Sequence, residues 1–200
     1  MAMNRFPIDN VNDIVGAYRD SDEKLYASLE LNQVAFPKTG MVVSQTPLGA
    51  AFTKAAPCEN GMWVVADKAA GAINPPAAAT DTPIGIVYTS EKEYDIMHYG
   101  LQRFGRKVAG DYPRVGILGL GDTVTTNCLQ YDDGEFASEE ALITALEAIE
   151  TTPLYVQAVA GSAVPQITAT KPSAGTYAKV VKFYTVPNGG KGVKYQIVHL

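Results

Sequence analysis

The sequence predicts a mainly β protein: a compact β-barrel or sandwich-like domain with one inserted amphipathic helix and an extended N-terminal arm. From about residue 41 onward, short runs of β-branched and aromatic residues alternate with turn residues. One stretch, about residues 138–150, has apolar residues at helical spacing instead. The chain has 200 residues, 46% of them hydrophobic and 18% charged, so it can bury a core of its own.

Residues 1–40 are predicted to form the arm. Polar and apolar residues mix there without a clear period, Pro7 and Pro37 interrupt the chain, and residues 20–24 are charged or polar. A disordered terminus is the alternative for this segment. We therefore divide the chain into an arm, 1–40, and a β-rich domain, 41–200.

The first half of the domain reads as short strands separated by turns. Strands are predicted at residues 41–43, 62–66, 84–89 and 123–127. Asn60-Gly61 is a tight-turn dipeptide directly before the second of these strands. Residues 69–80 are small and contain Pro75-Pro76, which predicts a loop without regular pairing. Three glycines suggest bulges or closely packed backbones: Gly116, Gly119 and Gly121.

The helix has a start, a buried face and an end. Ser138 is a good N-cap, and Glu139 and Glu140 fall in the first turn, where the helix dipole favours carboxylates. Five residues share one face and are expected to pack on the core: Ala141, Leu142, Ala145, Leu146 and Ile149. Residues 151–153, ending in proline, stop the helix.

The last fifty residues return to strands. They are predicted at 154–160 and 165–170, followed by a hairpin over 177–198. The hairpin arms, 177–186 and 191–198, are joined by residues 187–190, which include an Asn-Gly pair suited to a tight turn. Simple alternation places Val181 and Phe183 on one face and Val180 and Tyr184 on the other. Both faces are then partly apolar, so coverage on both sides is expected.

Charge divides the chain more sharply than its net value of −5 suggests. Residues 1–150 carry 11 basic and all 21 acidic side chains, a net charge of −10. Residues 151–200 carry only lysines, a net charge of +5: Lys171, Lys179, Lys182, Lys191 and Lys194. If the fold keeps these segments apart, the molecule has an acidic and a basic pole, which suits oriented docking to other subunits. A pair of strands with solvated lysines is the alternative.

The composition also argues against some partners and compartments. The acidic balance disfavours nucleic acid as a partner. No apolar run approaches the ~20 residues that span a bilayer. The first residues lack the apolar stretch of a secretion signal, so we expect synthesis in the cytoplasm of the producing cell. Cys58 and Cys128 are too few for a zinc site, and we expect two reduced thiols in the core, with one disulfide as the alternative.

No catalytic, cofactor-binding or metal site is predicted, and the chain is not expected to be an enzyme. His98 has acidic neighbours, Glu91, Glu93 and Asp95, which in a strand would share a face able to ligate a divalent metal. A solvated polar edge is the interpretation we favour for them.

Two further motifs lack the pattern of a ligand site. Residues 132–135 contain adjacent acids but not the alternating oxygen ligands of a calcium loop, so a turn is expected. Glycines 116, 119 and 121 do not follow the dinucleotide-binding order, and no Gly-Lys-Ser/Thr phosphate loop occurs.

The aromatic residues favour a binding surface. Eleven tyrosines stand against one tryptophan and six phenylalanines. Tyrosine suits interfaces, because its ring packs while its hydroxyl meets water. Tyrosine also stacks on sugars, so a carbohydrate-binding module is the alternative, although the usual tryptophan platform is missing.

Five segments, taken in their order along the chain, carry a resemblance: Pro83–Tyr88 followed by Ser90–Asp95, Tyr112–Gly116, Leu120–Asn127 and Val180–Gly189. Together they resemble structural proteins of tailed bacteriophages, in particular head decoration (cement) proteins, and the resemblance covers about residues 41–200. The resemblance implies a non-enzymatic virion component, bound outside the capsid, that stabilises the head by contacts bridging subunits. The implied partners are the major capsid protein or other virion subunits and further copies of the chain, as a trimer or dimer. A baseplate, neck or tail module is the alternative position.

Overall fold

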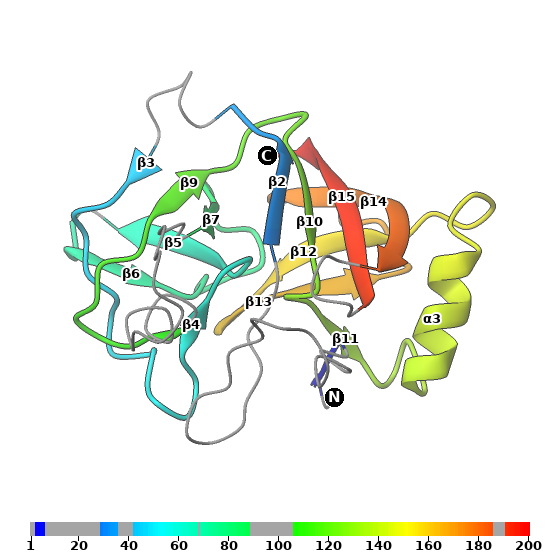
Figure 1. Ribbon diagram of the computed structural model, residues 1–200, viewed down its shortest axis with the longest axis horizontal. Helices are drawn as coiled ribbons and strands as arrows, with labels where there is room; N and C mark the ends of the chain where they lie inside the picture. The colour runs from blue at the N-terminus through cyan, green and yellow to red at the C-terminus, as the bar shows by residue number, and fades with distance from the viewer. Residues whose placement is uncertain (1–2, 7–28, 36–41, 68, 89–105, 186–190) are drawn as a thin grey trace, which may run out of the picture.

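The computed structural model describes residues 3–6, 29–35, 42–67, 69–88, 106–185 and 191–200. The chain is mainly β, as predicted, with one helix among these residues. Two sheets lie side by side, and the helix packs at the far side of the larger one (Figure 1). The larger sheet has eight strands in the order β1 (Met3–Arg5), β11 (Gln130–Asp132), β13 (Ser162–Thr168), β12 (Tyr155–Val159), β14 (Tyr177–Thr185), β15 (Lys191–His199), β10 (Thr123–Thr126) and β2 (Leu29–Gln33).

The smaller sheet has five short strands. Their order is β3 (Val42–Val43), β9 (Val115–Ile117), β7 (Gly85–Val87), β5 (Trp63–Asp67) and β6 (Ala72–Asn74). A separate ribbon pairs β4 (Cys58–Glu59) with β8 (Arg106–Lys107). The end strands of the larger sheet, β1 and β2, do not pair with each other in the described part of the chain. The arrangement is therefore sandwich-like, and the barrel form of the prediction is not realised.

The main core contains residues of both sheets and of the helix. The smaller sheet contributes the fully buried Trp63 and Ile86, and the larger contributes Val156 and Tyr195, also fully buried. The indole Nε1–H of Trp63 donates a hydrogen bond to the Tyr195 hydroxyl at 3.0 Å, and the rings meet edge to face with centroids 5.9 Å apart. This contact joins the sheets through one pair of side chains and satisfies the indole N–H, which would be costly to bury alone.

Helix α3 (Glu139–Glu147) forms where its sequence predicts it. The Ser138 hydroxyl accepts a hydrogen bond from the Ala141 N–H at 3.2 Å, which caps the helix. Leu142 and Leu146 are buried in the main core. Ala141 is exposed, so its predicted place in the buried face is wrong. At about 100° per residue it lies at the margin of a stripe centred on the two leucines.

Most of the strands predicted in the domain are confirmed, and two local predictions are wrong. Strand β13 begins at Ser162 rather than Pro165. Its pairing with β12 is irregular next to Pro165, so a residue without an N–H is tolerated there. Strand β6 lies inside the predicted loop 69–80. Its pairing with β5 ends at Asn74, so the two prolines lie just outside the strand and do not interrupt it.

The predicted hairpin is confirmed as β14 paired with β15, but its faces differ from the prediction. The register shifts between Val180 and Lys182, so Val181 is an extra residue in the ladder. Val180 and Phe183 consequently pack on the core side, while Val181 is half exposed. Simple alternation failed because a one-residue bulge moves every later side chain to the other face. The joining residues 186–190 lie outside the described residues.

Two described pieces of the predicted arm belong to the larger sheet. Strands β1 and β2 form its two edges, pairing with β11 and β10. Phe6 is fully buried, its N–H donates to the Leu129 carbonyl at 2.8 Å, and its ring meets Phe183 edge to face. The rest of residues 1–40 lies outside the described residues.

Replacing Tyr195 by phenylalanine is expected to destabilise the fold. The change keeps the ring but removes the acceptor, so the buried Trp63 N–H loses its partner, at a cost of about 1–3 kcal/mol. Urea unfolding measures the difference. Tyr112→Phe is the matched control, because Tyr112 is 59% exposed and its change should stay within about 0.5 kcal/mol. Equal stability of the two variants would contradict the role of this contact.

Candidate protein-docking surface

The residues considered for metal binding do not form a described site. Glu91, Glu93, Asp95 and His98 lie outside the described residues. Within the part of the chain that the structure describes, no three His, Cys, Asp or Glu side chains come together as a metal site would require.

The acidic segment at residues 132–135 is the turn that its sequence predicts. The Asp132 carboxylate accepts a hydrogen bond from the Gly134 N–H at 2.7 Å. Glu135 accepts from the Thr168 hydroxyl at 2.9 Å and from the Ala169 and Thr170 N–H groups at 2.7 and 3.1 Å. These bonds tie the end of β13 to the segment before α3, which is a structural role for the carboxylate.

The two cysteines are buried and neither is in a disulfide. Burial raises the pKa of the Cys128 thiol to about 12, and the positive charge of Arg5 opposes this shift. A thiol with so high a pKa is neutral at ordinary pH and therefore a poor nucleophile. Cys128 thus behaves as a core residue, as the sequence predicts for both thiols.

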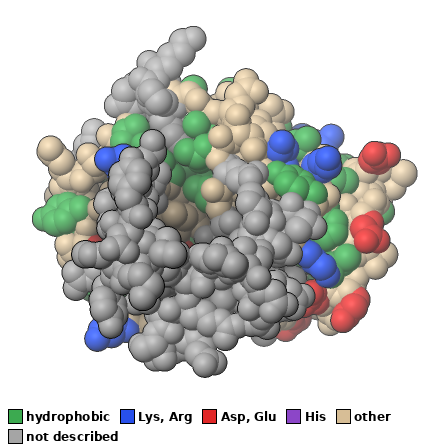
Figure 2. Space-filling view, viewed as in Figure 1, with side chains coloured by type: hydrophobic (Ala, Val, Ile, Leu, Met, Phe, Trp, Pro, Cys, Tyr) green, Lys and Arg blue, Asp and Glu red, His purple; other side chains and the backbone are tan. Residues whose placement is uncertain are grey.

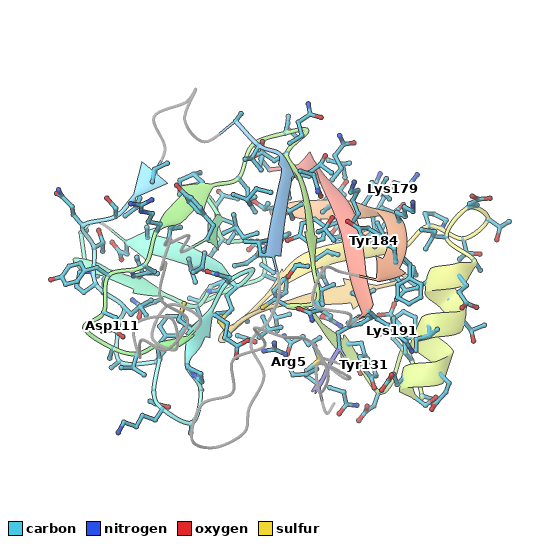
Figure 3. All side chains as sticks on the ribbon, viewed as in Figure 1. Arg5, Asp111, Tyr131, Lys179, Tyr184 and Lys191 are labelled. Carbon is cyan, nitrogen blue, oxygen red and sulfur yellow. The ribbon has the colours of Figure 1, made fainter. Side chains whose placement is uncertain are left out.

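The basic residues of the last fifty gather mainly on the hairpin. Lys179 and Lys182 project from β14, and Lys191 and Lys194 from β15, with Lys171 in the loop after β13. Figure 3 labels Lys179 and Tyr184 on the hairpin and Lys191 at its end, beside α3. We call the outward side of β14 and β15 the lysine face, defined by Lys179, Lys182, Tyr184 and Lys194.

The lysine face is basic because of strand register. Lys182 and Lys194 are directly opposite each other on neighbouring strands, and Lys179 is opposite Gln196. On the next strand, Thr125 pairs with Lys194. Five adjacent strands, β13, β12, β14, β15 and β10, contain no Asp or Glu at all. The centre of the larger sheet therefore carries ammonium groups without any carboxylate from its own strands.

Tyr184 organises the centre of this face. Its ring lies beneath two ammonium groups, with the Nζ atoms of Lys182 and Lys194 at 5.6 and 5.9 Å from the ring centroid. Its hydroxyl bonds the Thr125 hydroxyl, which donates to the Asn32 side-chain oxygen at 2.6 Å. Because the Thr125 proton is used in that bond, the Tyr184 hydroxyl is the donor to Thr125. The ring is therefore fixed by a chain of bonds across β14, β10 and β2.

Other tyrosines are divided between the core and the sheet surface. Tyr155 meets Tyr177 edge to face at 6.1 Å, and Tyr177 stacks on His199 at 4.9 Å. The His199 Nδ1 lies 2.8 Å from the Gly175 carbonyl, so that nitrogen carries the proton. Of the described tyrosines, Tyr131, Tyr177 and Tyr195 are buried. Part of the tyrosine excess is thus explained by packing rather than by binding.

Acidic side chains of α3 and the turn after it lie beside the lysine face. Glu140, Glu147 and Glu150 are exposed, and Glu139 lies 4.0 Å from the ammonium group of Lys191. The pKa of Glu140 is lowered, first by a hydrogen bond from its own backbone and then by one from the Ser138 hydroxyl. In Figure 2 the lysines over β14 and β15 stand next to acidic side chains on the α3 side. The hairpin therefore carries a basic surface. The exposed acids of α3 lie next to this surface, so they do not form an acidic pole opposite to it.

The sequence indicated the lysines but not the cluster around Tyr184. Asn32, Thr125 and Tyr184 are separated by many residues and meet only through the pairing of β2, β10, β15 and β14. No residue pattern within any one strand points to this combination. Among the described residues, no helix has the length and apolar character required to cross a membrane.

Stability is expected to fall at alkaline pH in a way that depends on Cys128. The unfolded thiol ionises above its ordinary pKa of 9.0, whereas the native thiol stays neutral until about 12, so stability is lost as the pH rises through this window. Between pH 8 and 10.5, wild type should lose about 1–2 kcal/mol more than Cys128→Ala in urea unfolding. Parallel pH profiles for the two proteins would contradict the assignment.

Comparisons of the chain with protein-family models, with curated proteins and with solved structures found no match.

Proposed function

We propose that this chain is a non-enzymatic structural protein of a phage virion. It binds the outside of the capsid and stabilises the head by contacts that bridge subunits. Its partners are the major capsid protein or other virion subunits, together with further copies of itself. The observation that carries the proposal is the lysine face, an exposed sheet surface with fixed aromatic and basic groups and no carboxylate on its own strands.

The chemistry of this face suits docking to protein. A fixed tyrosine ring adds apolar contact area at a small entropy cost, since its hydroxyl is already held by Thr125, which in turn donates to Asn32. The lysines at its edges steer an acidic partner and set the orientation of the encounter. Repeated weak contacts of this kind gain strength when many copies bind one shell.

The order of phage-like motifs in the sequence supports placing this surface in a virion. Two of these motifs fall on the elements that build the lysine face: Leu120–Asn127 contains β10, and Val180–Gly189 overlaps β14. The motifs that raised the phage hypothesis and the surface that suits docking thus share residues.

Co-sedimentation with expanded phage heads tests the proposal. Wild type is expected to sediment with the heads at a fixed ratio. Reversing two charges at the centre of the face, with Lys182→Glu and Lys194→Glu, should weaken binding about ten-fold or more, equivalent to about 1.4 kcal/mol.

The matched control reverses two exposed lysines away from the face, Lys54 and Lys171, which gives the same change in net charge. This control should bind like wild type. Equal binding by both double variants would contradict docking through the lysine face. Absence of head binding together with recognition on a glycan array would replace the proposal with a carbohydrate-binding function, and binding to isolated tails or baseplates would move the protein within the virion.

A further inference from the structure

The lysine face contains an electrostatic conflict. Lys182 and Lys194 stand directly opposite each other on paired strands, an arrangement of like charges that destabilises a sheet. No described carboxylate lies within ion-pair distance of either ammonium group. Tyr184 offsets part of the repulsion through its ring. An acidic group brought from outside would relieve the remainder.

The same molecule has an exposed acidic surface that could neutralise the two lysines of another copy. Glu147 ends α3 and Glu150 follows in the next turn, and both are exposed. The two carboxylates are three residues apart in the chain, one on each side of the helix C-cap Ala148. Among the described residues no cation pairs with either of them.

The two surfaces are adjacent but do not satisfy each other within one chain. Helix α3 touches the end of the hairpin through Glu139 and Lys191, which lie 4.0 Å apart. Figure 3 places Lys191 at this junction, with Tyr184 further along the hairpin. A basic and an acidic surface side by side are self-complementary under a two-fold rotation, which brings each onto its opposite in a second copy.

We propose that the lysine face binds α3 of a second copy of this chain. In the resulting two-fold dimer, Lys182 and Lys194 of each copy face Glu147 and Glu150 of the other, and the tyrosine ring between the lysines packs against the helix. The inference rests on the proposed function only in treating the lysine face as a protein-docking surface. It goes further by naming a second copy as the occupant of this face in the absence of heads, and by assigning a role to the acidic side of α3.

Sedimentation velocity of the full chain, in the absence of heads, tests the proposal. Wild type is expected to dimerise at 50 mM NaCl and to dissociate at 500 mM, because added salt screens exposed charge pairs. The Lys182→Glu, Lys194→Glu variant and the Glu147→Lys, Glu150→Lys variant should each be monomeric at 50 mM. The Lys54→Glu, Lys171→Glu control should dimerise like wild type.

Mixing the two monomeric variants is the decisive step. One then presents two acidic surfaces and the other two basic surfaces, so both contacts of the two-fold dimer become complementary again. A heterodimer should form in the mixture with an affinity close to that of wild type. The two lysines and the two glutamates that are changed are at exposed or partly exposed positions. Equal thermal melting temperatures of the variants would confirm that each folds.

Two results would overturn the proposal: a wild type that is monomeric at 50 mM NaCl, or a mixture of variants that stays monomeric. Binding of an acidic oligonucleotide or glycan at the lysine face, with no self-association, would likewise overturn it. The outcome is separable from the proposed function. A monomer that still sediments with phage heads leaves the function standing, whereas a dimer that ignores heads leaves the dimer standing and removes the function.

Discussion

The contact between Trp63 and Tyr195 sets the geometry on which the rest of the structure depends. It is a fully buried hydrogen bond between a side chain of the smaller sheet and one of the larger. Tyr195 points inward from the middle of β15, so the residues on either side of it, Lys194 and Gln196, must point outward. The bond that holds the two sheets together thereby also fixes which side chains of β15 reach the surface. Packing and surface chemistry are two consequences of one register.

The parts of the fold that depend on neighbouring residues were predictable from sequence, and those that depend on distant partners were not. The turn at Asn60-Gly61, the cap at Ser138 and the hairpin over 177–198 depend on neighbouring residues, and all could be predicted. Strands β1 and β2 could not, because they are short edge strands stabilised by partners far along the chain. The bulge at Val181 was also missed, since nothing local to that run of residues distinguishes a shifted ladder from a regular one.

The candidate surface was predictable only in part, for the same physical reason. Composition alone located the lysines in the last fifty residues. Strand alternation would place Lys179 and Lys182 on opposite faces, because it does not anticipate the bulge at Val181 that brings them to the same side. Only the three-dimensional pairing places Lys182 opposite Lys194, with Tyr184 beneath both. The acidic side chains beside them come from α3 and the turn that follows it, whose place next to the hairpin is a tertiary contact. Charge distribution along a chain therefore does not predict charge distribution in space.

The central claim is that protein covers the lysine face in the assembled state. Acetylation of individual lysines, followed by mass spectrometry, tests it directly by comparing the free chain at high salt with the chain bound to phage heads. The account predicts that Lys182 and Lys194 react much more slowly in the assembly, while the exposed Lys54 reacts at an unchanged rate. Equal rates at all three lysines in both states would contradict it.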